Sequence, residues 1–139
     1  MPTLKNGMRS RARYAAVALA NTPDNVRVVR ICTSLSGFAC INPKHSDFGM
    51  LCAPRPVTRK ALYIYLHECA HFVLHADRKR RGSYVEEMEA EQWAHKKMRE
   101  AGIAVPRMMT RDAKYQIAVL MIRACNEYTW NSVFHTRSL

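Results

Sequence analysis

The sequence predicts a single α+β domain, in which a small antiparallel or mixed three-stranded sheet packs on one buried helix and two to three further helices complete the fold. Short β-branched and apolar segments separated by turn residues occupy the N-terminal part, and longer segments with helical periodicity follow them. The 139 residues are enough for one hydrophobic core, and 48% hydrophobic with 24% charged residues is a globular composition. We therefore expect residues 1–139 to fold as one domain.

The N-terminal part is expected to contain one helix and the three strands. A basic helix ends at a turn-rich stretch around Pro23, and the first strand alternates β-branched residues with arginines. The expected bounds are residues 8–20 for the helix and Asn25–Ile31, Phe38–Asn42 and Phe48–Ala53 for the strands. Because Pro54 and Pro56 lack the N–H groups that ladder hydrogen bonds need, we expect the strand before them, Phe48–Ala53, to be an edge of the sheet.

The remaining sequence predicts three helices. Thr58 can cap the first of them, and Ser83 with Glu86 forms a capping box that can start the second. Gly102 is well placed to end that second helix. The expected bounds are residues 58–76, 83–101 and 110–126, and the last helix would carry an apolar face made by Ala113, Ile117, Leu120, Met121 and Ala124.

Charge and cysteine content narrow the functional class. Twenty-two Lys and Arg residues against eleven Asp and Glu residues give a net charge of +11, which attracts polyanions and makes nucleic acid a candidate partner. The five cysteines form no CxxC pair and leave one odd thiol, which argues against a disulfide framework and favours a cytoplasmic location. No apolar stretch approaches the length of a membrane span, so no membrane partner is expected.

The segment His67–His71 has the pattern HExxH. Residues four apart lie on the same face of a helix, so the imidazoles of His67 and His71 can reach one metal ion, and zinc is the ion that this pattern favours. Glu68 would lie beside the ion, where it can hold a water molecule and act as catalytic base.

The helix that carries this pattern is expected to be buried. Between residues 61 and 76 only four side chains are neither apolar nor aromatic: His67, Glu68, His71 and His75. Such groups are costly to bury unless they are hydrogen-bonded or bind a metal. The alternative to a metal is that core hydrogen bonds or a water channel satisfy all four. His75 could be a third histidine ligand, but we expect it to be a buried histidine beside the site, and Cys69 to pack in the core.

A catalytic zinc needs a third protein ligand, and four glutamates of the next helix compete for that role: Glu86, Glu87, Glu89 and Glu91. At about 100° per residue, Glu87 and Glu91 fall in the apolar arc with Tyr84 and Met88, whereas Glu86 and Glu89 fall among the solvated charges. Trp93 fits this assignment poorly. We therefore expect Glu87 to be the third ligand and Glu91 to orient an imidazole, that of His67 in the first place.

Two segments together, His67–His75 and Glu87–Ala94, resemble the ImmA/IrrE-type zinc metallopeptidases. That family pairs HExxH, often followed by Leu-His, with a later helix that reads E-x-x-A-(D/N/E)-x-aromatic-Ala. The resemblance covers roughly residues 48–100 and implies a glutamate-type zincin, with His67, His71 and Glu87 as zinc ligands and Glu68 as catalytic base. Members of the family are common in phages and mobile elements and often act on DNA-bound regulators, which implies a substrate of that kind.

The leading hypothesis is therefore zinc-dependent hydrolysis of a peptide bond in a protein or peptide substrate, which could add as a strand to the Phe48–Ala53 edge. One alternative is a nucleic-acid-associated protein with a non-catalytic zinc site. Another is an inhibitory interaction protein whose zinc stabilises a small core.

Two further sets of residues are candidates for binding roles. The nucleic-acid contacts would come from a basic loop of Arg78, Lys79, Arg80 and Arg81, although a merely solvated loop is an alternative. A peptidase also needs a donor for the developing oxyanion, and the candidates are Tyr84, Tyr115 and His135.

Overall fold

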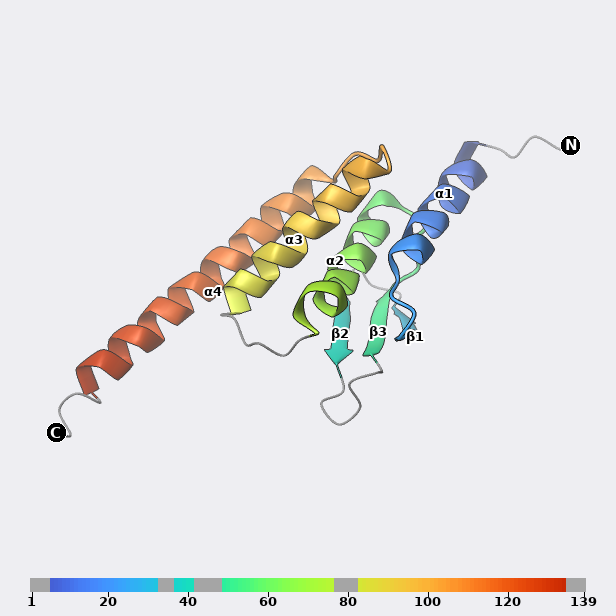
Figure 1. Ribbon diagram of the computed structural model, residues 1–139. Helices are drawn as coiled ribbons and strands as arrows, with labels where there is room; N and C mark the ends of the chain where they lie inside the picture. The colour runs from blue at the N-terminus through green and yellow to red at the C-terminus, as the bar shows by residue number, and fades with distance from the viewer. Residues whose placement is uncertain (1–5, 33–36, 42–48, 77–82, 135–139) are drawn as a thin grey trace, which may run out of the picture.

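The computed structural model describes residues 6–32, 37–41, 49–76 and 83–134, and in these ranges it shows four helices and a three-stranded sheet (Figure 1). In chain order the elements are α1 (Asn6–Asn21), β1 (Val26–Cys32), β2 (Phe38–Ile41), β3 (Gly49–Pro54), α2 (Arg59–His75), α3 (Ser83–Glu100) and α4 (Arg107–Phe134). The predicted α+β class is confirmed. Every expected element is present, and all bounds except those of α4 agree within two residues.

The sheet is mixed, and its strand order is β1-β3-β2. β1 runs parallel to β3, and β2 runs antiparallel to β3, with Ala39 opposite Leu51. β3 is therefore the central strand, and the expectation that Phe48–Ala53 forms an edge was wrong. Pro54 is the last residue of β3, so its missing N–H removes no hydrogen bond from the interior of the ladder, and a proline there is compatible with a central strand.

The helix α2 is the centre of the fold. The Thr58 side chain accepts a hydrogen bond from the Ala61 N–H at 3.1 Å, as the sequence predicted for a helix cap. Ten of its seventeen residues are buried, because the sheet covers one side and α3 the other (Figure 1). The sheet comes so close at Gly49 that a Cβ atom there would lie 2.7 Å from Cδ1 of Phe72.

Two of the remaining helices flank this central helix. α1 packs on α2, where Thr22 Oγ1 and the Tyr65 hydroxyl lie 2.8 Å apart. α3 ends as predicted, because Gly102 adopts φ +67° and the Ile103 N–H donates to the Met98 carbonyl at 2.9 Å.

The helix α4 differs most from its prediction, because it begins three residues earlier and ends eight residues later. It runs beside α3 and continues past the N-terminal end of α3 (Figure 1). Ala113 and Ile117 on its expected apolar face are half-buried, but Met121 is 47% exposed. No helix in the described ranges is both long and apolar enough to pass through a membrane.

Candidate metal centre

Three side chains from two helices converge in the middle of the molecule. His67 and His71 project from successive turns of α2, and Glu87 reaches them from the first part of α3. His67 Nε2 lies 2.9 Å from Glu87 Oε2, and His71 Nε2 lies 3.3 Å from Glu87 Oε1. One potential ligand atom of each residue lies within 4.8 Å of those of the other two, so His67, His71 and Glu87 form a group that could hold a metal ion.

The donor set fits zinc in its chemistry and its dimensions. Four ligands at about 2.0–2.1 Å from a tetrahedral zinc ion are separated from one another by about 3.3 Å. The two nitrogen–oxygen distances at Glu87, 2.9 and 3.3 Å, are close to that separation. Both imidazole side chains are 16% exposed and the Glu87 side chain is 38% exposed, so the group is open to solvent on one side. Three protein ligands with one open side are the arrangement of catalytic zinc sites.

The charges of this group are strongly coupled. Hydrogen bonds from His67 and His71 hold the pKa of Glu87 far below its usual range, so this carboxylate is ionised. Burial opposes the charging of His71, but Glu87, Glu68 and Glu86 outweigh it, and the pKa of His71 is raised. The carboxylate of Glu87 therefore stabilises positive charge at this position, whether on an imidazole or on a bound cation.

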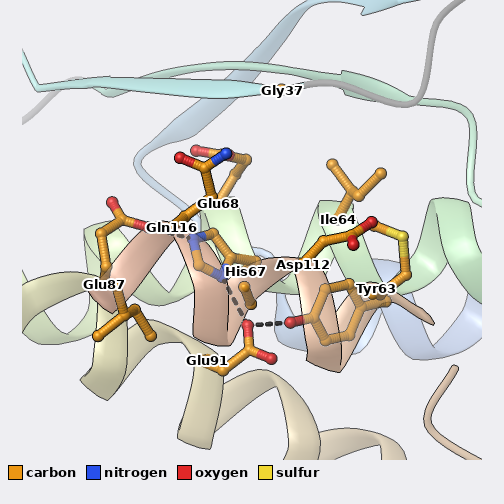
Figure 2. A pocket seen from close by; sticks show the side chains of 12 residues that line it. Gly37, Tyr63, Ile64, His67, Glu68, Glu87, Glu91, Asp112 and Gln116 are labelled. Carbon is orange, nitrogen blue, oxygen red and sulfur yellow. Dashed lines mark hydrogen bonds and ion pairs between the residues drawn. The ribbon is translucent and has the colours of Figure 1, made fainter. Parts of the chain in front are cut away.

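Glu68 lies beside the group and not within it. Its side chain points toward Gly37, which immediately precedes β2, as Figure 2 shows, and a Cβ atom on Gly37 would lie only 3.0 Å from Glu68 Cγ. Burial raises the pKa of Glu68, against the opposing influence of His67, His71 and a hydrogen bond from the Ala39 backbone N–H. A carboxylate with a raised pKa is a stronger base than an ordinary glutamate, which suits a group that must accept a proton from water.

Glu91, one turn after Glu87, lies behind His67. Its Oε2 atom is 3.5 Å from His67 Nδ1 and accepts a hydrogen bond from the Tyr63 hydroxyl (Figure 2). Its Oε1 atom lies 2.9 Å from His95 Nε2. Burial raises the pKa of Glu91 to about 7. These are the contacts expected of a carboxylate that orients His67.

His75 is buried beside the histidine pair, with 8% of its surface exposed. Its Nδ1 atom lies 3.0 Å from His71 Nδ1, and its Nε2 atom lies 3.3 Å from Glu89 Oε2. Glu89 was placed among the solvated charges, and this was wrong: its side chain is 28% exposed and contacts His75. Cys69 is fully buried in the core, as expected, and burial raises the pKa of its thiol to about 12.

Two cavities meet at the group, and both are lined by Gly37, His67, Glu68 and Glu87. The first cavity has a volume of about 460 Å³ and a largely apolar wall that continues onto α4. The second has a volume of about 530 Å³ and lies along β2. Of these two cavities, the first alone is lined by Tyr63, Ile64, Glu91, Met109, Asp112, Ala113, Gln116 and Ile117. The second alone is lined by Phe38, Ala39, His71, His75 and Glu86.

Sequence reasoning missed the residues of the site that lie outside the two motifs. His95 follows Glu87 and Glu91 at the same four-residue spacing, so helical periodicity could have found it. Asp112 and Gln116 line the first cavity only because α4 packs across α3, a contact that no local pattern encodes.

Several predicted residues are not part of the described site. Tyr115 is 68% exposed on α4, and neither it nor Tyr84 lines either of these two cavities. His135 and the basic loop of Arg78, Lys79, Arg80 and Arg81 lie outside the described residues.

Comparisons of the chain with protein-family models, with curated proteins and with solved structures returned no match.

Proposed function

We propose that the protein is a zinc-dependent metallopeptidase that hydrolyses a peptide bond in a protein substrate. One observation carries the proposal: His67, His71 and Glu87 each offer a ligand atom within 4.8 Å of the other two, with Glu68 beside them where two cavities meet. A peptidase needs space on both sides of the scissile bond, and the two cavities offer it. The sequence resemblance to ImmA/IrrE-type enzymes supports the same conclusion.

The three ligands and Glu68 would have different roles in peptide hydrolysis. A zinc ion held by His67, His71 and Glu87 would supply a Lewis acid that polarises the scissile carbonyl group and acidifies a water molecule. Glu68 would accept the proton of that water and pass it to the nitrogen of the leaving amine. Its raised pKa suits both steps, because the group must be deprotonated to accept the proton and must hold it long enough to deliver it.

The substrate would lie along β2. Among the described strands β2 has one neighbour, β3, so its other edge can accept a peptide as an additional strand. Phe38 and Ala39 line the second cavity, next to Glu68. This assigns to β2 the role that was expected of the Phe48–Ala53 strand. A substrate side chain could then enter the apolar cavity between α2 and α4.

The experiment that tests the proposal compares Glu68→Gln with the wild type on a quenched fluorescent peptide library, with both proteins loaded with zinc. We expect Glu68→Gln to bind zinc normally and to lose proteolysis by at least about 100-fold. Glu100→Gln is the matched control, because Glu100 is exposed on the far end of α3 and should leave both properties unchanged. Equal cleavage rates for Glu68→Gln and the wild type would refute the proposal.

If the substrate is bound to DNA, the protein itself should bind a DNA duplex through its positive charge. Net charge is +11, and the α1 segment carries no acidic residue while Arg9 and Arg11 are exposed on it. Binding of a DNA duplex should then weaken steeply between 50 and 200 mM salt, by about 10³-fold if six phosphates are contacted. Fluorescence anisotropy measures this, and an affinity independent of salt would exclude it.

A further inference from the structure

His71 has another imidazole, that of His75, behind it. Its Nε2 atom faces Glu87 at 3.3 Å, and its Nδ1 atom faces Nδ1 of His75 at 3.0 Å. The second nitrogen of His75 faces Glu89 Oε2 at 3.3 Å. The three side chains therefore form a continuous chain of contacts that leads from the metal-facing nitrogen of His71 to a carboxylate on α3.

Metal binding would permit one arrangement of protons along this chain. An imidazole nitrogen that binds a metal must present its lone pair, so His71 would keep its proton on Nδ1. That N–H can be satisfied only if His75 Nδ1 accepts it, which leaves the proton of His75 on Nε2. Nε2 is the atom that faces the Glu89 carboxylate, so each N–H in the chain has an acceptor.

We propose that His75 is a positioning residue, which holds His71 in the tautomer and ring orientation that bind zinc and is itself held by Glu89. The proposal rests on the metal centre of the proposed function, but it does not depend on proteolysis. It gives a role to a buried histidine that the three-ligand set leaves unused. Metal-ligating histidines usually donate their outer N–H to a carboxylate, a carbonyl group or water, and here an imidazole occupies that place.

The contacts of His75 argue against its being a ligand itself. Both of its ring nitrogens already have partners, His71 on one side and Glu89 on the other. It is 8% exposed, and it is not a member of the group of side chains whose ligand atoms converge.

The test compares the zinc affinity of full-length variants by competition with a chelator, with zinc alone as the probe. We expect His75→Leu to bind one zinc ion roughly 10- to 100-fold more weakly than the wild type, because the outer N–H of His71 loses its acceptor. His75→Gln should recover most of the affinity, since its amide can accept from His71 and donate to Glu89. The matched control is Phe72→Leu, which changes a buried side chain of the same helix turn and should lower stability without changing zinc affinity.

A spectroscopic measurement separates positioning from a general structural role. In the zinc-loaded wild type, nitrogen-15 NMR should detect scalar coupling between the two Nδ1 atoms across their N–H···N hydrogen bond. Wild-type zinc affinity in His75→Leu, or a proton on Nδ1 of His75, would overturn the proposal. A loss of zinc affinity well beyond 100-fold in His75→Leu, as expected for a lost ligand, would overturn it as well. A wild type that binds zinc but cleaves no peptide would refute the proposed function alone, whereas a wild type that binds no zinc would refute both.

Discussion

The two histidines of the candidate metal centre are supported in different ways. His67 has a carboxylate directly behind it, because Glu91 Oε2 lies 3.5 Å from its Nδ1 atom. His71 has His75 behind it, and the carboxylate of Glu89 comes only after that second imidazole. The Glu91 side chain is also the more enclosed, with 10% of its surface exposed against 28% for Glu89. We call these two arrangements the direct flank and the indirect flank.

One helix, α3, supports both histidines of α2. α3 supplies Glu87 to the metal group and also both supporting carboxylates. On the direct flank, Tyr63 and His95 hold Glu91 in place, so that its orientation is set from both α2 and α3. An electrostatic effect that passes through an intervening neutral ring should be weaker than one exerted by direct contact. We therefore expect zinc affinity to depend more on the direct flank.

The same substitution at the two carboxylates tests this comparison with the largest expected effect. Glu91→Gln should weaken zinc binding roughly 10- to 100-fold, because it removes the negative charge next to His67 and keeps the size of the side chain. Glu89→Gln should weaken it only several-fold. Chelator competition at pH 8, above the pKa of Glu91, measures both, and equal losses at the two positions would show that the flanks do not differ.

The pH dependence of stability provides a second test, in the metal-free protein. Burial raises the pKa of Glu91 from its ordinary value of 4.5 to about 7, so between these values the folded state keeps a proton that the unfolded state has lost. The contribution of Glu91 to the free energy of unfolding should therefore fall as pH rises through this window, by up to about 3 kcal/mol.

Glu91→Gln isolates that contribution. Urea unfolding of the wild type and of Glu91→Gln should give free energies that diverge as pH rises from 5 to 8, with the variant gaining relative to the wild type. The raised pKa values of His71 and Glu68 also make the protein less stable as pH rises. Because both groups are present in both proteins, their effects cancel in the difference between the two unfolding free energies. Curves that stay parallel would show that Glu91 titrates normally in the folded protein.

Gly37→Ala should affect neither flank and thus has the smallest expected effect on zinc affinity. The new Cβ atom would lie 2.9 Å from the Cys52 carbonyl oxygen and 3.0 Å from Glu68 Cγ. The backbone at residue 37 or the Glu68 side chain must therefore shift. We expect zinc affinity within about twofold of the wild type and proteolysis reduced roughly tenfold, because Glu68 moves relative to the substrate. A parallel loss of both properties would show that Gly37 supports the metal group itself.

The sequence predicted the parts of the site that follow helical spacing. HExxH placed His67 and His71 on one face of α2, and the apolar arc of α3 separated Glu87 from Glu86, so the members of the metal group could be named before the structure was known. The same arc misplaced Glu89, because a long side chain outside the apolar arc can still reach the neighbouring helix. Glu89 contacts His75, a residue of α2 that lies outside the metal group.

The contacts that sequence did not predict depend on tertiary packing. The place of β3 between β1 and β2 is set by long-range pairing, and a proline at the end of a strand is compatible with either a central or an edge position. The contribution of α4 to the first cavity likewise depends on how α3 and α4 cross. A polar residue such as Gln116 carries no periodic signal of its own.

The most direct test of the account is the zinc content of the wild type, His71→Ala and Glu87→Gln after dialysis against buffered zinc. We predict one zinc ion per wild-type chain and an affinity roughly 100- to 1,000-fold lower in each variant, because each loses one of three protein ligands. A wild type free of zinc, or a His71→Ala protein that retains it equally well, would contradict the account.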